Sequence, residues 1–340
     1  MEIALNKENY RKERIARGIK ARSDDIYALT SYKEMWFLLF PRLMPIVGIA
    51  ILAYFMPVYW KKVVLSTCTF AMLAVSWDFL SSCGMLSMGQ ALFFGMGSYT
   101  AGCLDHYFHF PVYATIPLAT VIGACLSTMV LMPVIRLRGI YFAMVTLILP
   151  LMLMRLIEAT KILGGTEGIT RLSPFPNVWV EVTLILAAMW VALFALRRFI
   201  ASDYGLIFVS IRDNDRAVMA SGINIYAFKA QALFIGSSIC AFCGAFMTHA
   251  YQFTGMPVFA MDYSILPIAA AAIGGIGTLA GPLLGAFILV PLSELLREFG
   301  PLRIVFYGLI LVICVVVLPE GIFHYLSRKY NEMERWTRIE

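Results

Sequence analysis

Long apolar runs separated by short polar segments fill most of this chain. A run needs about 20 mostly apolar residues to cross a bilayer, and it is expected to be helical because a helix satisfies its own backbone hydrogen bonds in lipid. The pattern predicts ten crossings, three of them short or interrupted. They cover residues 37–58, 63–80, 83–102, 112–134, 139–157, 178–196, 230–250, 262–276, 281–297 and 302–318.

One polar segment, at about residues 199–229, divides the predicted membrane part into two halves. Five charged or amide residues follow one another at its centre: Arg212, Asp213, Asn214, Asp215 and Arg216. So many polar groups are costly inside a bilayer, so the segment is expected to lie in water, in the cytoplasm. Asp203 is a candidate helix cap and Gly222 a candidate C-terminal stop. The alternative is an ordinary solvated loop.

The distribution of basic residues predicts the topology. Residues 1–36 form a basic tail, residues 37–320 the transmembrane domain, and residues 321–340 a C-terminal tail. With both termini in the cytoplasm, most Lys and Arg lie on the inside, as the positive-inside rule requires. The few that fall outside are Lys61, Lys62, Lys161, Arg171, Arg297 and Arg303.

Composition agrees with a membrane protein, because 60% of the residues are hydrophobic and only 14% are charged. Soluble domains carry about a quarter charged residues. The predicted fold class is therefore an all-α polytopic membrane protein with two pseudo-repeated halves. The net charge of +6 follows the topology and gives no reason to expect a nucleic-acid partner. The Cys240-x-x-Cys243 pair lies among apolar residues, which favours helix packing over a redox or metal site.

Two glycine-rich interruptions, one in each half, are the candidate translocation path, because broken helices in corresponding positions of two halves are typical of transporters. The candidates are Ser87, Gly89, Gln90, Gly95, Gly97 and Tyr99 in the first half and Gly274, Gly275 and Gly277 in the second. Thr146, Gly165 and Thr166 are placed near the same path or its outer mouth. The alternative for each glycine is close helix packing.

No catalytic or metal-binding constellation is recognisable, and neither H-E-x-x-H nor the P-loop motif G-x-x-x-x-G-K-[ST] occurs. The ionisable residues in the spans lie mostly near predicted ends, which argues against proton coupling. They are Asp78, Asp105, Arg155, Glu158 and Glu294. No enzyme activity and no cofactor are therefore expected in this chain.

Five collinear segments resemble the LivM-like permease subunits of branched-chain amino acid ABC importers. They are LSMGQALFFGMGSYTAG (86–102), LRGIYFAMVTL (137–147), GGTEGI (164–169), IRDNDRAVMASGIN (211–224) and GGIGTLAGPLLGA (274–286). The resemblance covers about residues 40–320. It implies a multi-pass pore subunit of the bacterial inner membrane, with membrane lipid around it. The implied partners are a second homologous permease subunit, in a heterodimer, two cytoplasmic P-loop ATPases that bind ATP and magnesium, and a periplasmic substrate-binding protein.

The resemblance also implies a coupling role for a short cytoplasmic helix that fits a cleft in the ATPase. The matching residues are Arg212, Asp213, Asn214, Asp215, Arg216, Ala217, Ser221 and Gly222. Asp215 stands where the family more often has Glu, and Val218 and Met219 replace small alanines. The implied solutes are branched-chain or related hydrophobic amino acids, with urea or short amides as the alternative within the family. A self-contained secondary carrier or channel, and a membrane enzyme, are the alternatives outside it.

Overall fold

The computed structural model describes residues 10–14, 48, 56–317, 320–331 and 334–338. Seven segments of that part are long and apolar enough to cross a membrane. They are α3 (Val58–Ser82), α5 (Val112–Leu131), α6 (Ile140–Thr160), α7 (Val178–Ile200), α9 (Ile225–Tyr251), Met256–Gly274 and Ala280–Gly300. The chain is therefore an all-α polytopic membrane protein, as predicted.

The other described helices complete the predicted order. They are α4 (Gln90–Phe108), α8 (Asp203–Ala220), α10 (Asp262–Gly274), α11 (Ala280–Leu295), α12 (Arg303–Val317), α13 (Ile322–Asn331) and the short 3₁₀ helices η2 (Val134–Arg136), η3 (Met256–Phe259) and η4 (Leu296–Leu302). A helix coincides with each predicted crossing from 63–80 onward, although α3 and α9 begin earlier than predicted. The first predicted crossing, residues 37–58, falls almost entirely outside the described residues. The total of ten crossings and the two repeated halves stay predictions.

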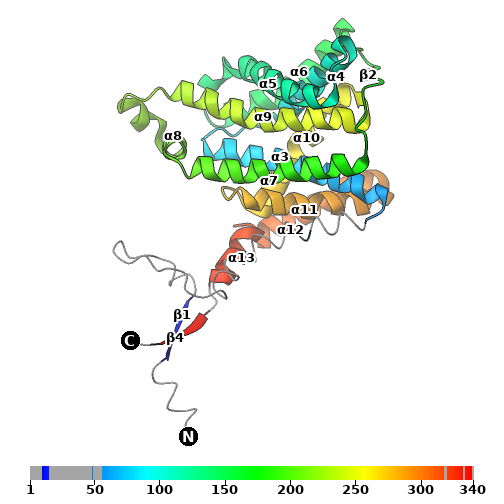
Figure 1. The fold of residues 1–340 in the computed structure, drawn as a ribbon. Coiled ribbons are helices and arrows are strands. Elements are labelled where there is room, and N and C mark those ends of the chain that lie inside the picture. Colours follow the sequence, from blue (N-terminus) through cyan, green and yellow to red (C-terminus); the bar gives the residue numbers. More distant parts are fainter. Residues whose placement is uncertain (1–9, 15–47, 49–55, 318–319, 332–333, 339–340) are drawn as a thin grey trace.

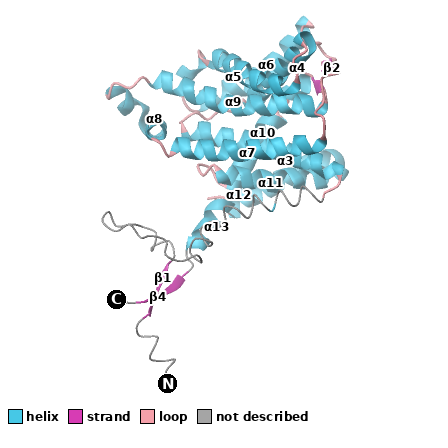
Figure 2. Cartoon of the chain, viewed as in Figure 1, coloured by secondary structure: helices cyan, strands magenta, loops and turns pink. Residues whose placement is uncertain are grey.

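Helix α3 lies at the centre of the bundle and is buried along most of its length. It packs against α7, α9, α10 and α11, while α4 and α5 pack on α9. Figure 1 shows α9, α7, α3 and α11 running in one general direction, with α8 at one end of the bundle and β2 (Ile169–Thr170) at the other. Figure 2 shows that helices make up nearly all of this body.

Small residues allow α4, α5 and α9 to approach closely. A side chain at Gly97 would collide with the backbone of Ala241, and one at Gly123 would lie 3.0 Å from the Cα of Gly97. At Gly244 a side chain would collide with the backbone of Phe94. Packing of this kind replaces the hydrophobic driving force that helices lack within lipid.

Two short sheets join segments far apart in the sequence. Strand β1 (Tyr10–Arg14) pairs antiparallel with β4 (Glu334–Arg338), and β2 pairs antiparallel with β3 (Phe253–Thr254). The sequence analysis described both ends only as tails and did not predict the β1–β4 pairing. The assignment of residues 321–340 to a tail also missed α13.

Candidate functional site

The first break is the non-helical segment at residues 83–89, between α3 and α4. Side chains from three helices satisfy its backbone. The indole Nε1 of Trp77 donates to the Ser87 carbonyl at 2.7 Å, and the Met88 amide donates to Thr146 Oγ1 at 3.0 Å. At the start of α4, the Ala91 amide donates to Ser264 Oγ at 3.1 Å. Such partners are required because backbone groups freed by a helix break find no water in a bilayer.

The second break, residues 275–279, lies between α10 and α11. Asp78 of α3, whose side chain is completely buried, accepts hydrogen bonds from the Gly277 amide at 2.5 Å and the Leu279 amide at 2.8 Å. Leu279 has φ +57, a left-handed conformation that costs free energy for a branched side chain. The carboxylate therefore stabilises a strained turn and provides an acceptor for the amide of buried Leu279.

The two breaks are connected through α3 and α10. The helix that supplies Asp78 to the second break, α3, continues directly into the first break. Ser264, which accepts from the first turn of α4, belongs to α10, the helix that ends at the second break. The sequence predicted an interruption in each half, and the structure has a non-helical segment at each place. However, α4 runs unbroken through Gly95, Gly97 and Tyr99, so the first interruption is shorter than predicted. Helices α3 and α10 link the two segments.

The predicted path residues do not all lie together. Ser87, Gln90 and Thr146 are fully buried at the first break or beside it. Gly275 and Gly277 belong to the second break, which Gly274 precedes as the last residue of α10. Gly89 is buried there too, because its Cβ would lie 2.6 Å from the Thr146 carbonyl. The solute path itself stays a prediction.

Three other predicted path residues lie in helix contacts within α4. A side chain at Gly95 would collide with the ring of Phe259, and Gly97 contacts Ala241 as described above. Tyr99 stacks on Phe259 with ring centroids 5.5 Å apart. These contacts favour the packing alternative for Gly95 and Gly97.

Two buried polar atoms of α4, one at the first break and one farther along the helix, have no hydrogen-bond partner among the described residues. Gln90 accepts from Cys240 Sγ at 2.9 Å, yet its Nε2 has no acceptor. The hydroxyl of Tyr99 likewise has no partner. Unpaired polar groups in a core are costly and mark places where a solute or water could bind.

Gly165 and Thr166 belong to the tight loop before β2, at the end of the bundle opposite α8 (Figure 1). Gly165 is buried with φ +53, and Thr166 is exposed. The β2–β3 pairing attaches this loop to the segment that follows α9. Nearby, Asp105 accepts from the amide and the hydroxyl of Ser173, each at 2.7 Å.

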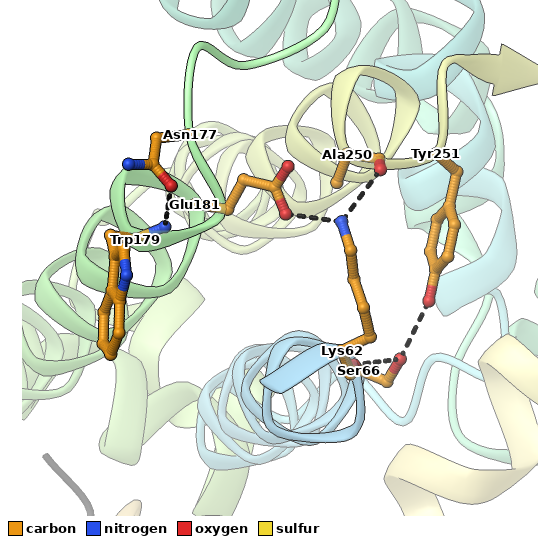
Figure 3. A network of polar contacts seen from close by, with 7 residues as sticks. All are labelled: Lys62, Ser66, Asn177, Trp179, Glu181, Ala250 and Tyr251. Atoms are coloured by element: carbon orange, nitrogen blue, oxygen red, sulfur yellow. Dashed lines mark hydrogen bonds and ion pairs between the residues drawn. The ribbon is translucent and has the colours of Figure 1, made fainter. Parts of the chain in front are cut away.

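A polar network joins α3, α7 and α9, as Figure 3 shows. Lys62 Nζ lies 2.5 Å from Glu181 Oε2 and donates to the Ala250 carbonyl at 3.2 Å. The hydroxyls of Ser66 and Tyr251 are 3.2 Å apart. The sequence analysis did not single out Glu181. The sequence did contain a signal for this pair: Glu181 lies at the start of the apolar span 178–196, on the same predicted side of the membrane as Lys62.

Helix α8 occupies the polar segment that the sequence placed in water. Its buried side, formed by Phe208, Ile211 and Val218, packs into the apolar core. Its exposed side, called here the α8 surface, comprises Arg212, Asp213, Asn214, Arg216, Ala217, Ser221 and Gly222. Gly222 has φ +85 and follows the last turn, which confirms the predicted stop.

Two details of α8 were not predicted. Asn214 is non-helical, with φ −156 and ψ 93, and its side chain accepts from the Ala217 amide at 3.2 Å, so it caps a second short helix. The first helix begins at Asp203 with Ser202 in the cap position, so Asp203 is not the cap. Asp215 is half-buried and its Oδ2 lies 3.0 Å from Arg138 Nε.

The α8 helix contacts the first break directly. A Cβ on Gly84 would lie 3.0 Å from the Cα of Arg212, so the backbones of the break and of α8 are in close contact. Gly84 has φ +76, which also favours glycine. An exposed charged helix thus lies against the segment that joins α3 to α4.

Breaks between helices inside a polytopic bundle are typical of membrane transport proteins. Comparison with known proteins gives the same class. Residues 60–318 match the family described as branched-chain amino acid transport system, permease component, and the chain belongs to that family.

Individual relatives are distant. The chain is 24% identical over 270 residues to the high-affinity branched-chain amino acid transport system permease protein LivM of Salmonella typhimurium, and equally to that of Escherichia coli. The match covers 70% of this chain and 64% of each relative. The probable branched-chain amino acid transport permease protein LivM of Methanocaldococcus jannaschii is 22% identical over 60% of this chain and 66% of the relative. No solved structure matches.

Proposed function

We propose that this chain is the transmembrane permease subunit of an ATP-binding cassette importer in the bacterial inner membrane. The solute is a branched-chain or related hydrophobic amino acid, delivered by a periplasmic binding protein. A second homologous permease completes a heterodimeric pore, and two cytoplasmic P-loop ATPases bind ATP and magnesium. Family membership supports the transport role. The sequence has no P-loop motif, so ATP must be bound by another chain.

The contact between α8 and the first break carries this proposal. The α8 surface is exposed and charged, while the opposite side of α8 is fixed in the core. A partner that moves α8 would also move the break, because Arg212 lies against Gly84. A second route runs through Asp215 and Arg138 to α6, whose Thr146 accepts from the other end of the same break.

The topology proposed is ten crossings with both termini in the cytoplasm. An even number of crossings places the two termini on one side. The β1–β4 pairing supports this, because strands hydrogen-bonded to each other cannot lie on opposite sides of a membrane. Arg138 is paired with Asp215 of α8, so both lie at one end of the bundle, and placing that end in the cytoplasm agrees with the positive-inside rule.

The solute path is proposed to follow the two breaks. Their backbone groups are oriented by Thr146, Ser264 and Asp78, and the unpaired Gln90 amide lies beside them. No described cation is hydrogen-bonded to Asp78, whose carboxylate is occupied by the Gly277 and Leu279 amides. A carboxylate used in this way fits a structural role better than a proton relay.

Co-purification tests the proposal. The detergent-solubilised chain is isolated as wild type and as an Arg212/Asp213/Asp215/Arg216 alanine variant, and co-purifying proteins are identified. We expect a P-loop ATPase and a second permease with the wild type, and loss of the ATPase alone from the variant. A matched control replaces Arg155, Glu158, Lys161 and Glu167 with alanine. It also removes two basic and two acidic residues, and it should retain the ATPase.

The result that contradicts the proposal is equally clear. If no ATPase accompanies the wild type and the chain alone moves solute in liposomes, the chain is a self-contained carrier. If the ATPase is retained equally by wild type, variant and control, the importer remains but α8 is not its coupling surface.

A further inference from the structure

The C-terminal segment of the described chain contacts the second break from outside the bundle. A side chain on Gly321 would collide with the backbone of Gly275. In turn, a Cβ on Gly275 would lie 3.1 Å from the Glu320 carbonyl and 3.1 Å from His324 Nδ1. Gly321 is buried and has φ +82, so both its conformation and its contact require glycine.

Helix α13 begins at this contact. The Tyr325 amide donates to the Gly321 carbonyl at 3.3 Å, which forms the first turn. The helix packs against α10 and α11, the two helices that flank the second break, and Ile322 joins the apolar core. Farther along, Tyr325, Leu326 and Arg328 are exposed. One side of α13 is therefore fixed on the break, and the other is open to a partner.

The first break has the same arrangement. Gly84 follows the end of α3 with φ +76, and α8 lies against it through Arg212. Gly275 follows the end of α10 with φ +113, and α13 lies against it through Gly321 and His324. In each case a membrane helix ends at a glycine, and a partly exposed helix contacts that glycine.

We propose that α13 is a second transmission helix, which positions the second break as α8 positions the first. Movement of α13 shifts Gly275 and the following turn, whose amides are held by Asp78. Because Asp78 belongs to α3, which continues into the first break, the two transmission helices act on one connected element. Gly321 and His324 are positioning residues in this proposal. Its consequence for transport rests on the proposed function, whereas its structural part does not.

The test compares Gly321→Ala with Gly300→Ala in the full chain. Both glycines have positive φ, but Gly300 has no atom near the position of an added Cβ. Both substitutions therefore introduce backbone strain, and only Gly321→Ala disturbs the contact with Gly275. A chain ending at residue 319 provides a second perturbation if Gly321→Ala does not fold.

Hydrogen exchange at the Gly277 and Leu279 amides is the first readout. We expect exchange about tenfold faster in Gly321→Ala and in the shortened chain, and unchanged in Gly300→Ala, because local opening sets the exchange rate. The second readout, in the co-purified complex, is solute moved per ATP hydrolysed. We expect it to fall about fivefold in Gly321→Ala, while hydrolysis continues, because coupling and hydrolysis are separate steps.

Unchanged exchange in both perturbed chains overturns the proposal, as does equal acceleration in Gly300→Ala. Faster exchange with an unchanged ratio of solute to ATP overturns the transmission role. Absence of a co-purifying ATPase would instead contradict the proposed function, and the exchange result would still decide whether α13 positions the second break.

Discussion

Replacing Asp78 with alanine tests whether the second break depends on that carboxylate. Asp78 is the acceptor for the Gly277 and Leu279 amides, at 2.5 and 2.8 Å. Alanine at position 78 removes the carboxylate that accepts from both amides. An unsatisfied buried donor costs about 1–3 kcal/mol. The Leu279 amide is buried, but Gly277 is exposed, so the second donor contributes less. The expected loss is about 2–4 kcal/mol in the free energy of unfolding.

Asp78→Asn should lose about half as much, because its amide oxygen can still accept one of the two hydrogen bonds. The assay is unfolding of the purified chain in mixed micelles of increasing SDS content, together with hydrogen exchange at residues 275–281. Asp213→Ala is the control, since that carboxylate is exposed and its ion pair with Arg212 is a surface pair. If Asp78→Ala unfolds at the same SDS fraction as the control, and exchange at the break is unchanged, the role assigned to Asp78 is wrong.

Three further sets of substitutions test the polar network, the helix packing and the first break in the same unfolding assay. Lys62→Met should lower the free energy of unfolding by about 2–3 kcal/mol because it leaves buried Glu181 unpaired. The double variant Lys62→Met/Glu181→Leu should recover most of that loss. If it does not, loss of the ion pair is not the cause. Gly97→Ala should lower the free energy of unfolding by about 1–3 kcal/mol because the added methyl group overpacks a helix contact. The control Gly308→Ala, which has open space around it on α12, should lie within about 0.5 kcal/mol of wild type. Equal effects of the two substitutions would contradict the packing role of Gly97. Thr146→Val removes the acceptor used by the first break and should cost about 1–3 kcal/mol; a loss near zero would mean that the break needs no such acceptor.

The sequence predicted most of the helical order, because apolar runs bounded by charges and glycines mark membrane helices well. It also predicted a break near each glycine cluster, since such clusters weaken a helix locally. The first break ends at Gly89, and α4 is continuous through the predicted residues Gly95, Gly97 and Tyr99. The polar segment at 199–229 was correctly expected to be a surface helix ending at Gly222. These features depend on residues close together in the sequence.

The features that the sequence analysis missed depend on residues far apart. Asp78 was recognised only as a carboxylate near the end of a span, because nothing local shows that its partners are the Gly277 and Leu279 amides. The pairing of Lys62 with Glu181 and the β1–β4 register were missed for the same reason, because the paired residues are far apart in the sequence.

In a sequence, a glycine that lines a path looks the same as a glycine that permits close helix packing. The sequence therefore could not separate Gly95 and Gly97, which contact neighbouring helices, from Gly275 and Gly277, which form a break. Only the identity of the atoms opposite each glycine distinguishes the two uses.

ATP-dependent uptake tests the central claim most directly. The co-purified complex is reconstituted into liposomes, and uptake of radiolabelled leucine is measured with and without ATP, magnesium and the binding protein. The account predicts accumulation only when all three are present, and loss of that accumulation in the Arg212/Asp213/Asp215/Arg216 alanine variant. Leucine uptake by this chain alone, at a rate that ATP does not change, would contradict it.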